Sequence, residues 1–236
     1  MIINKRVPIS FLYSLFKKEL PYVILIAGGL SYLDQFIEPV LGLQFPLMPM
    51  TIPSILGTLI TLILAFKTSQ SYDRWWEARK IWGEVVNDSR AFIREISFLM
   101  KEDNEERKIL RDELITQMIG WCYTLAHSLR GKHDISDNPY IDEELKTKLD
   151  QIDNNTPNAL LYLMMSNIKQ VFDKGFINEY QQIKLTSSIN NISIAMGKSE
   201  RIKHTVFPRL YARFIDFAIW AFMIIFPLAF REKMII

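Results

Sequence analysis

The chain has 236 residues, of which 49% are apolar and 23% charged, and this composition excludes a disordered or fibrous protein. Its 28 Lys and Arg residues nearly balance its 26 Asp and Glu residues, so it lacks the basic excess that a nucleic-acid-binding surface usually needs. A single cysteine, Cys122, excludes an intramolecular disulfide, and the histidines lie too far apart in the sequence to suggest a shared metal ion. We therefore expect no nucleic-acid partner, no bound metal and no cofactor.

Charged residues are unevenly distributed along the chain. No Lys or Arg occurs in residues 19–66, whereas charges of both signs are dense in residues 67–203. This distribution is typical of a membrane-embedded part followed by a soluble part. We predict that residues 1–66 form an N-terminal helix and a transmembrane hairpin, that residues 67–205 form a cytosolic α-helical domain, and that residues 206–236 return to the membrane.

Two apolar stretches, Leu20–Leu33 and Ile52–Phe66, lie in the part that lacks cations. The connection between them is rich in proline, which interrupts helices. Its prolines are Pro39, Pro46, Pro49 and Pro53. We therefore predict a hairpin of two helices that run in opposite directions. Because Lys and Arg flank both outer ends of the hairpin and are absent from the connection, the positive-inside rule predicts that both outer ends are cytoplasmic.

A third apolar stretch, Phe214–Phe230, is interrupted by Asp216 and Pro227. All three stretches are shorter than the ~20 apolar residues that a spanning helix usually needs, so buried helices of a soluble α-bundle are an alternative. The one-sided distribution of Lys and Arg favours the membrane. A secretory signal peptide is disfavoured, because the first apolar run begins only near residue 20 and no small-residue cleavage site follows it.

The middle of the chain, residues 74–201, carries apolar residues at helical spacing and no period-two run that predicts a strand. Residues that recur at this spacing include Leu110, Leu114, Met118 and Trp121. Turn residues gather in residues 130–139 and 150–157, and Thr156 directly before Pro157 predicts a helix N-cap. We therefore expect one all-α domain here.

No residue constellation indicates catalysis. The sequence contains no nucleotide-binding, zinc-protease or serine-hydrolase motif. Neighbouring carboxylates such as Glu105 and Glu106 lie among Lys and Arg, which is typical of a solvated helix face. Cys122 and His127 are five residues apart, which on a helix places them on different faces. We therefore expect that the protein is not an enzyme.

Residues 71–83, SYDRWWEARKIWG, place three tryptophans beside Arg74, Arg79 and Lys80 where an apolar helix is predicted to meet water. Tryptophans and cations of this kind mark the membrane boundary wherever helices cross it, so an interfacial anchor would explain the composition. It would not require this order of residues.

The order of residues DRWWEARKIWG after an apolar helix resembles the signature of the bestrophin family of ion channels. The residues that carry this likeness are Arg74, Trp75, Trp76, Glu77 and Arg79. A second segment, GKSERI at residues 197–202, is followed by Pro208 and an apolar helix, and it resembles the stretch before the family's later membrane helix. The two motifs and the helix order cover nearly the whole chain.

This resemblance implies an all-α fold in which membrane helices continue into a cytosolic helical domain. It also implies a homo-pentamer in the lipid bilayer, with one pore on the five-fold axis that is lined by the second apolar helix. Such an assembly would conduct small monovalent ions, either chloride or monovalent cations. Eukaryotic members are anion channels, whereas related bacterial members pass cations, so the resemblance leaves the sign of the ion open.

The family's narrow neck has three apolar rings, four residues apart, upstream of the Arg-Trp-Trp motif. Counting back from that motif places the equivalents here at Thr58, Leu62 and Phe66. Residues four apart share a helix face at ~6 Å intervals, so five copies would stack successive rings. Thr58 departs from the apolar pattern of these rings. An alternative to the neck assignment is that Leu62 and Phe66 pack against neighbouring helices or lipid. The family also has a constriction at the cytosolic exit, which the resemblance places at Ile183.

Two departures from the family pattern lie at the end of the chain. No acidic cluster like the calcium site of eukaryotic members follows Phe230, so we expect no such site. The chain stops at Ile236, short of the family's final membrane helix, which we expect to be absent from this sequence, either because the chain is truncated or because its last segment bends back within the membrane near Pro227. With these features the chain resembles a bacterial member of the family. Such a member would be a multi-pass protein of the cell inner membrane or plasma membrane, with its helical domain in the cytoplasm.

A different class of function is a membrane-anchored helical scaffold or sensor without a pore. Residues 52–66 carry no charge, whereas a wide aqueous pore would usually show polar or ionisable residues. This absence fits either a neck that closes by dewetting or a plain anchor. The oligomeric state discriminates between the two, because a monomer cannot supply a five-fold pore.

Overall fold

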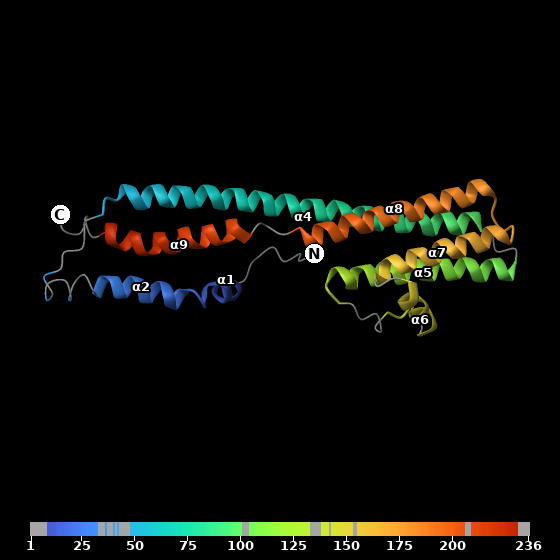
Figure 1. The fold of residues 1–236 in the computed structure, drawn as a ribbon, viewed down its shortest axis with the longest axis horizontal. Helices are drawn as coiled ribbons and strands as arrows, with labels where there is room; N and C mark the ends of the chain where they lie inside the picture. Colours follow the sequence, from blue (N-terminus) through green and yellow to red (C-terminus); the bar gives the residue numbers. More distant parts are fainter. Residues whose placement is uncertain are drawn as a thin grey trace. The chain divides into compact units, whose positions relative to one another are not determined.

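The computed structural model describes residues 9–32, 36, 40, 42, 48–100, 104–132, 138–141, 143–152, 155–205 and 209–230. The long elements are all α-helices, and no strand occurs within the described residues, which confirms the all-α prediction. The helices are α1 (Ile9–Phe16), α2 (Leu20–Tyr32), α4 (Thr51–Leu99), α5 (Glu105–Leu129), α6 (Glu143–Ile152), α7 (Thr156–Asp173), α8 (Glu179–His204) and α9 (Arg209–Phe230) (Figure 1).

The chain divides into two compact units. Unit 1 comprises residues 1–71 and 207–236, and unit 2 comprises residues 72–206. The division therefore falls inside α4, after Ser71. The predicted boundaries after residues 66 and 205 concern the membrane and the cytosol, and they stay predictions.

Helix α4 is a single helix of 49 residues that begins in unit 1 and ends in unit 2. Its one proline, Pro53, lies in the first turn, where a missing backbone N–H costs nothing because that group has no partner within the helix. No proline follows within the helix, so the backbone hydrogen bonds continue past Lys67, where the sequence changes from apolar to charged. The predicted pore helix and the first helix of the predicted cytosolic domain are thus one element.

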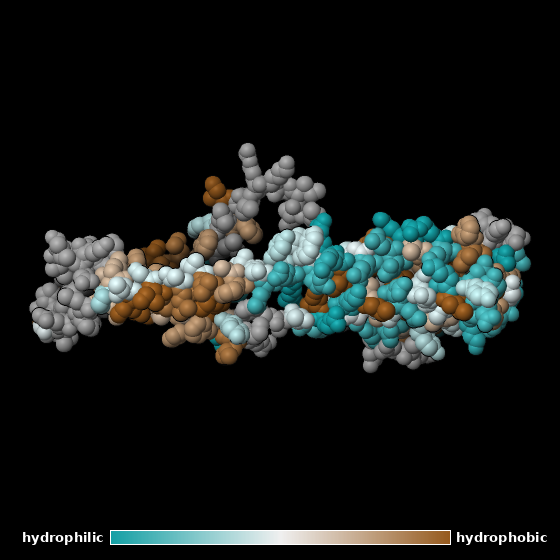
Figure 2. Space-filling view, turned by 90° about the horizontal axis from the view of Figure 1, so that it is seen from above, coloured by the Kyte–Doolittle hydropathy of each residue, from teal (hydrophilic) through white to brown (hydrophobic). Residues whose placement is uncertain are grey.

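Unit 1 is built from α1, α2, the first part of α4, and α9. Two helices are long and apolar enough to cross a membrane, namely α4 and the part of α9 at Leu210–Ala229, and α2 carries a shorter apolar run at Leu20–Gly29. Helix α9 packs against α2 (Figure 1). Hydrophobic residues gather on the surface of this unit, whereas the surface of unit 2 is largely hydrophilic (Figure 2). Pro39 and Pro46 of the predicted connection lie outside the described residues.

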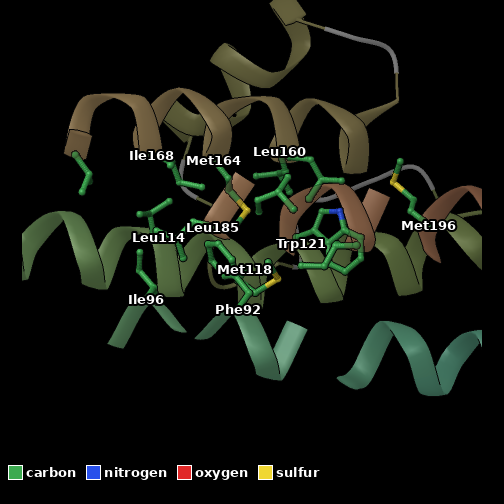
Figure 3. Packing of buried hydrophobic residues seen from close by; sticks show 14 of the residues in the cluster. Phe92, Ile96, Leu114, Met118, Trp121, Leu160, Met164, Ile168, Leu185 and Met196 are labelled. Atoms are coloured by element: carbon green, nitrogen blue, oxygen red, sulfur yellow. The ribbon is translucent and has the colours of Figure 1, made fainter. Parts of the chain in front are cut away.

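Unit 2 has a continuous hydrophobic core formed by the second part of α4 with α5, α7 and α8. Trp121 of α5 is fully buried, and Phe92 and Ile96 bring α4 into the same cluster (Figure 3). These residues come from the amphipathic pattern that predicted the helical domain, since apolar side chains three or four residues apart share one face. Burial of this apolar area, at ~25 cal/mol per Å², is the main force that holds the four helices together.

Polar side chains determine where the helices of unit 2 begin. Asn178 and Gln181 form a reciprocal capping box at the start of α8. The N-cap of α7 is Asn155, whose side chain accepts a hydrogen bond from the backbone N–H of Asn158. The prediction of Thr156 as the N-cap is therefore wrong by one residue. The cap precedes it because the Asn155 side chain reaches the N–H three residues ahead and leaves Pro157 within the first turn.

Hydrogen bonds and ion pairs tie α8 to α4 within unit 2. Lys198 Nζ lies 2.8 Å from Glu84 Oε2, and Lys184 Nζ lies 3.0 Å from Glu95 Oε1. Ser188 Oγ donates to the other oxygen of Glu95 at 2.5 Å. Each partly exposed pair contributes little to stability by itself, about 0 to 1 kcal/mol. Together they define which faces of α4 and α8 lie against one another.

Candidate functional site

The three predicted neck residues occupy one face of α4 in unit 1. Thr58, Leu62 and Phe66 follow one another at intervals of one turn. All three side chains are exposed in the single chain, with 54% of Leu62 and 62% of Phe66 accessible to solvent. Large apolar side chains with this exposure require lipid or another copy of the chain to cover them, or a pore that they line.

Hydroxyl groups on this part of α4 donate back to their own helix. Thr58 Oγ1 donates to the Ser54 carbonyl at 2.9 Å, and Ser54 Oγ donates to the Met50 carbonyl at 2.7 Å. Thr61 Oγ1 likewise donates to the Gly57 carbonyl at 2.8 Å. A hydroxyl has only one hydrogen to donate, so these groups present acceptor oxygens to their surroundings.

An open groove of about 600 Å³ lies between α4 and α9 in unit 1. Its α4 wall includes Gly57, Thr58 and Leu62, and its α9 wall is formed by Phe222 and Phe226. The groove therefore borders two of the three predicted neck residues, while Phe66 does not line it.

Sequence reasoning missed both phenylalanines of the groove. Phe222 and Phe226 are four residues apart, which predicts that they share a helix face. That spacing could have identified them as a pair. It could not identify α4 as their neighbour, because helical periodicity predicts which face of a helix is buried but not which element packs against that face.

The predicted aperture residue, Ile183, lies near the beginning of α8 in unit 2. Its side chain is 61% exposed, and the neighbouring Tyr180 is also exposed. Ile183 thus belongs to a different unit from the predicted neck.

The tryptophan motif forms a row of exposed aromatic and charged side chains on α4. The ring centroids of Tyr72 and Trp75 are 5.7 Å apart, and those of Trp75 and Trp76 are 6.0 Å apart. The guanidinium carbon of Arg79 lies 5.8 Å from the Trp75 ring centroid, within the range of a cation–π interaction.

Glu77 in the same row pairs with Lys80, one turn further along the helix. The distance from Lys80 Nζ to Glu77 Oε2 is 2.5 Å, and this hydrogen bond lowers the pKa of the Glu77 carboxyl. Because the pair is exposed, it stabilises the local side-chain arrangement more than the fold.

The two sequence motifs contact each other in unit 2. Arg74 Nη2 donates a hydrogen bond to the backbone carbonyl of Ile202 at 3.2 Å. Lys198 of the second motif also pairs with Glu84, which follows the first. The sequence predicted both motifs separately, and the structure shows that they form one junction between α4 and the end of α8.

Cys122 is mostly buried, and burial raises the pKa of its thiol, which opposes nucleophilic reactivity. No group of three or more His, Cys, Asp or Glu side chains that could hold a metal ion occurs among the described residues.

Comparison with solved structures supports the fold. A mutant of a bacterial bestrophin homolog from Klebsiella pneumoniae aligns with a TM-score of 0.78 and 21% identity, covering 92% of this chain and 76% of that chain. A second mutant of that homolog aligns with a TM-score of 0.72 and 22% identity, covering 88% of this chain and 73% of that chain. This similarity shows a shared all-α architecture.

Curated relatives share sequence with most of this chain. The voltage-dependent anion channel-forming protein YneE of Escherichia coli is 28% identical over 192 residues, which are 80% of this chain and 60% of that protein. The voltage-dependent anion channel-forming protein alr2987 of Nostoc sp. is 26% identical over 190 residues, which are 80% of this chain and 61% of that protein. The chain thus spans about three fifths of the length of these relatives.

The family model for the bacterial and fungal bestrophin proteins matches residues 10–236. That match includes α4 with its tryptophan motif, the junction of that motif with α8, and α9. Because it covers nearly the whole chain, this protein belongs to the bestrophin family, in its bacterial and fungal branch.

Proposed function

We propose that this chain is a subunit of an ion channel that passes small monovalent ions across a membrane, and that five copies surround a single pore. Membership of the bestrophin family supports a channel, and the curated relatives are named anion channel-forming proteins. The observation that carries the proposal is the exposed face of α4, where Thr58, Leu62 and Phe66 are stacked directly ahead of the family motif.

Conduction through this neck would be controlled by water. In a five-fold ring, Leu62 and Phe66 would form two successive apolar rings about 6 Å apart along the helix. A narrow apolar ring releases its water, and an ion that enters it loses hydration without gaining a substitute. The neck would therefore resist conduction when narrow and permit it when wide enough to stay wet.

Thr58 would form a polar ring next to these apolar rings. Because its hydroxyl hydrogen is donated to the Ser54 carbonyl, five copies would present five acceptor oxygens to an ion. Acceptor oxygens favour a cation, whereas the names of the curated relatives favour an anion. The proposal therefore includes a channel selective for chloride and a channel selective for monovalent cations. Reversal potentials measured with different salt concentrations on the two sides of the bilayer distinguish between them.

Further along the path, Ile183 would ring a second aperture in the cytosol. Its exposure at the first turns of α8 supports this role, because an aperture residue must not be buried in its own subunit. In this arrangement the hairpin and α9 of unit 1 would lie in the cell membrane, and unit 2 would lie in the cytoplasm. The apolar composition of α4 and α9 supports the membrane assignment.

A membrane-anchored scaffold without a pore is the second candidate. One observation favours it: residues 52–66 of α4 contain no ionisable side chain, as expected of a plain anchor. A scaffold requires neither a ring of subunits nor ionic current.

One experiment separates the two candidates. The mass of the purified assembly is measured by light scattering in mild detergent, and the same preparation is fused with planar bilayers. We expect the mass of five chains and single-channel currents. A well-folded monomer or dimer that carries no current would overturn the channel and favour the scaffold.

A further inference from the structure

We propose that the contact between Gly57 of α4 and Phe222 of α9 determines the width of the neck. This inference rests on the proposed function, since it concerns the same pore. It assigns Phe222 as a positioning residue that acts on the neck through the backbone of α4.

A side chain at residue 57 would displace the Phe222 ring or the backbone of α4 by a few tenths of an ångström. A Cβ atom built on Gly57 would lie 3.3 Å from Phe222 Cε2 and 3.8 Å from Phe222 Cζ. Two carbon atoms attract each other best at ~3.5–4.0 Å, so the first of these distances is shorter than a favourable van der Waals contact. The edge of the Phe222 ring therefore reaches the helix backbone because residue 57 is glycine.

The Phe222 ring also packs against a second aromatic ring. It stacks on Phe226 of the same helix, with ring centroids 5.3 Å apart and an interplanar angle of 27°. Aromatic pairs favour an offset geometry. A displacement of Phe222 is therefore expected to displace Phe226 as well, or the helix that carries both. The aromatic pair thus acts as a stiff spacer between α9 and α4.

The spacer lies beside the neck. Gly57 directly precedes Thr58, and the groove that Phe222 lines also borders Leu62. Because α4 is an unbroken helix, a displacement at residue 57 carries both neck residues with it. The same groove places α9 next to the predicted neck face, so in the proposed pore a change in the separation of the two helices changes the width of the neck.

The two substitutions act in opposite directions on the separation of the helices. Gly57→Ala adds a methyl group against the ring and moves the two helices apart. Phe222→Leu removes the ring edge and lets them approach each other. The double variant combines a larger residue 57 with a smaller residue 222, so the two changes compensate.

The experiment measures unitary conductance in planar bilayers for both single variants and the double variant. Light scattering and thermal unfolding of each preparation establish whether the assembly is intact. We expect Gly57→Ala and Phe222→Leu to change conductance in opposite directions, by at least twofold for Gly57→Ala, and the double variant to return it close to the unmodified value. Phe222→Leu tests the proposal even where Gly57→Ala fails to assemble.

Two control variants make the same kinds of substitution at residues outside the contact between Gly57 and Phe222. Gly29→Ala adds the same methyl group on α2, where no atom lies within 4 Å of the new carbon. Phe217→Leu makes the same change on α9 at a side chain that is 70% exposed. Both controls should conduct like the unmodified protein.

The possible failures are distinguishable. Absence of current from the unmodified protein in its assembled state would overturn the proposed function and this inference with it. Currents that Gly57→Ala and Phe222→Leu leave unchanged, in intact assemblies of a conducting protein, would overturn this inference alone. A double variant whose conductance stays at the Gly57→Ala value would also overturn it, because loss of the ring edge would then not relieve the effect of the added methyl group.

Discussion

Arg74 and Ile202 are joined by a hydrogen bond from the guanidinium Nη2 to the backbone carbonyl, although 128 positions separate them in the sequence. The acceptor lies in the last turn of α8, where carbonyl groups lack partners within the helix. A cation at a helix C-terminus also interacts favourably with the helix dipole. The arginine of the tryptophan motif therefore caps the helix that carries the second motif.

Arg74→Ala should weaken the end of α8 without unfolding unit 2. The change removes one hydrogen bond from an exposed arginine, so we expect a loss of about 0.5–1.5 kcal/mol in the free energy of unfolding. Amide hydrogen exchange at Lys203 and His204 should become faster. Arg90→Ala, at an exposed residue of the same helix, should change neither quantity. Equal exchange rates in both variants and the unmodified protein would show that the hydrogen bond does not support the helix end.

Phe92→Ala should strongly destabilise unit 2. Phe92 is fully buried in the core where α4 meets α5, so truncation leaves a cavity and should cost about 3–5 kcal/mol. Phe98→Ala on the same helix removes a side chain that is 81% exposed, and should stay within about 0.5 kcal/mol of the unmodified protein. Denaturant titration measures both. Similar stabilities of the two variants would contradict the assignment of the core face of α4.

The thiol of Cys122 should react slowly in the folded protein. Burial raises its pKa, so the folded state favours the protonated form, and this contribution to stability is full below the unfolded pKa and lost as pH rises through the folded pKa. At pH 8 we expect alkylation by iodoacetamide to be slower than in denaturant, since the thiolate is the reactive form. Equal rates in the two conditions would mean that Cys122 is accessible in the folded state.

Much of the fold could be predicted from the sequence, because segregated charge and helical periodicity report on burial and solvent. The apolar stretch at Ile52–Phe66 and the first part of the amphipathic pattern beyond Arg74 both lie in α4. The contact of Gly57 with Phe222 could not be predicted, since periodicity gives a face and no partner. The N-cap of α7 was misplaced because Asn155 and Thr156 are both good capping residues, and only the backbone geometry selects between them.

Ile183→Ala should change the permeability ratios among ions of different size. In the proposed assembly this residue rings a cytosolic aperture, so a smaller side chain widens the path where ions would be sieved. Because Ile183 is exposed in its own subunit, the substitution should leave the free energy of unfolding nearly unchanged. Ile194→Ala, at another exposed residue of α8, is the matched control. Permeability ratios that match the unmodified protein, in a folded and conducting variant, would count against Ile183 as the aperture.

The neck of Leu62 and Phe66 is the central claim, and the double variant Leu62→Ala, Phe66→Ala tests it most directly. Both substitutions shrink the apolar rings and let the constriction stay wet, while alanine preserves the helix. Leu59→Ala combined with Leu64→Ala removes similar apolar bulk from other exposed residues of α4 and should conduct normally.

The decisive measurement is single-channel recording of the Leu62→Ala, Phe66→Ala variant, with the mass and melting temperature of the same preparation. We predict an intact assembly with a higher unitary conductance or open probability than the unmodified protein. If the two side chains instead pack against neighbouring helices, the variant should lose about 2–5 kcal/mol per site and show no gain of current. An intact assembly whose conductance and open probability equal those of the unmodified protein would likewise contradict the neck.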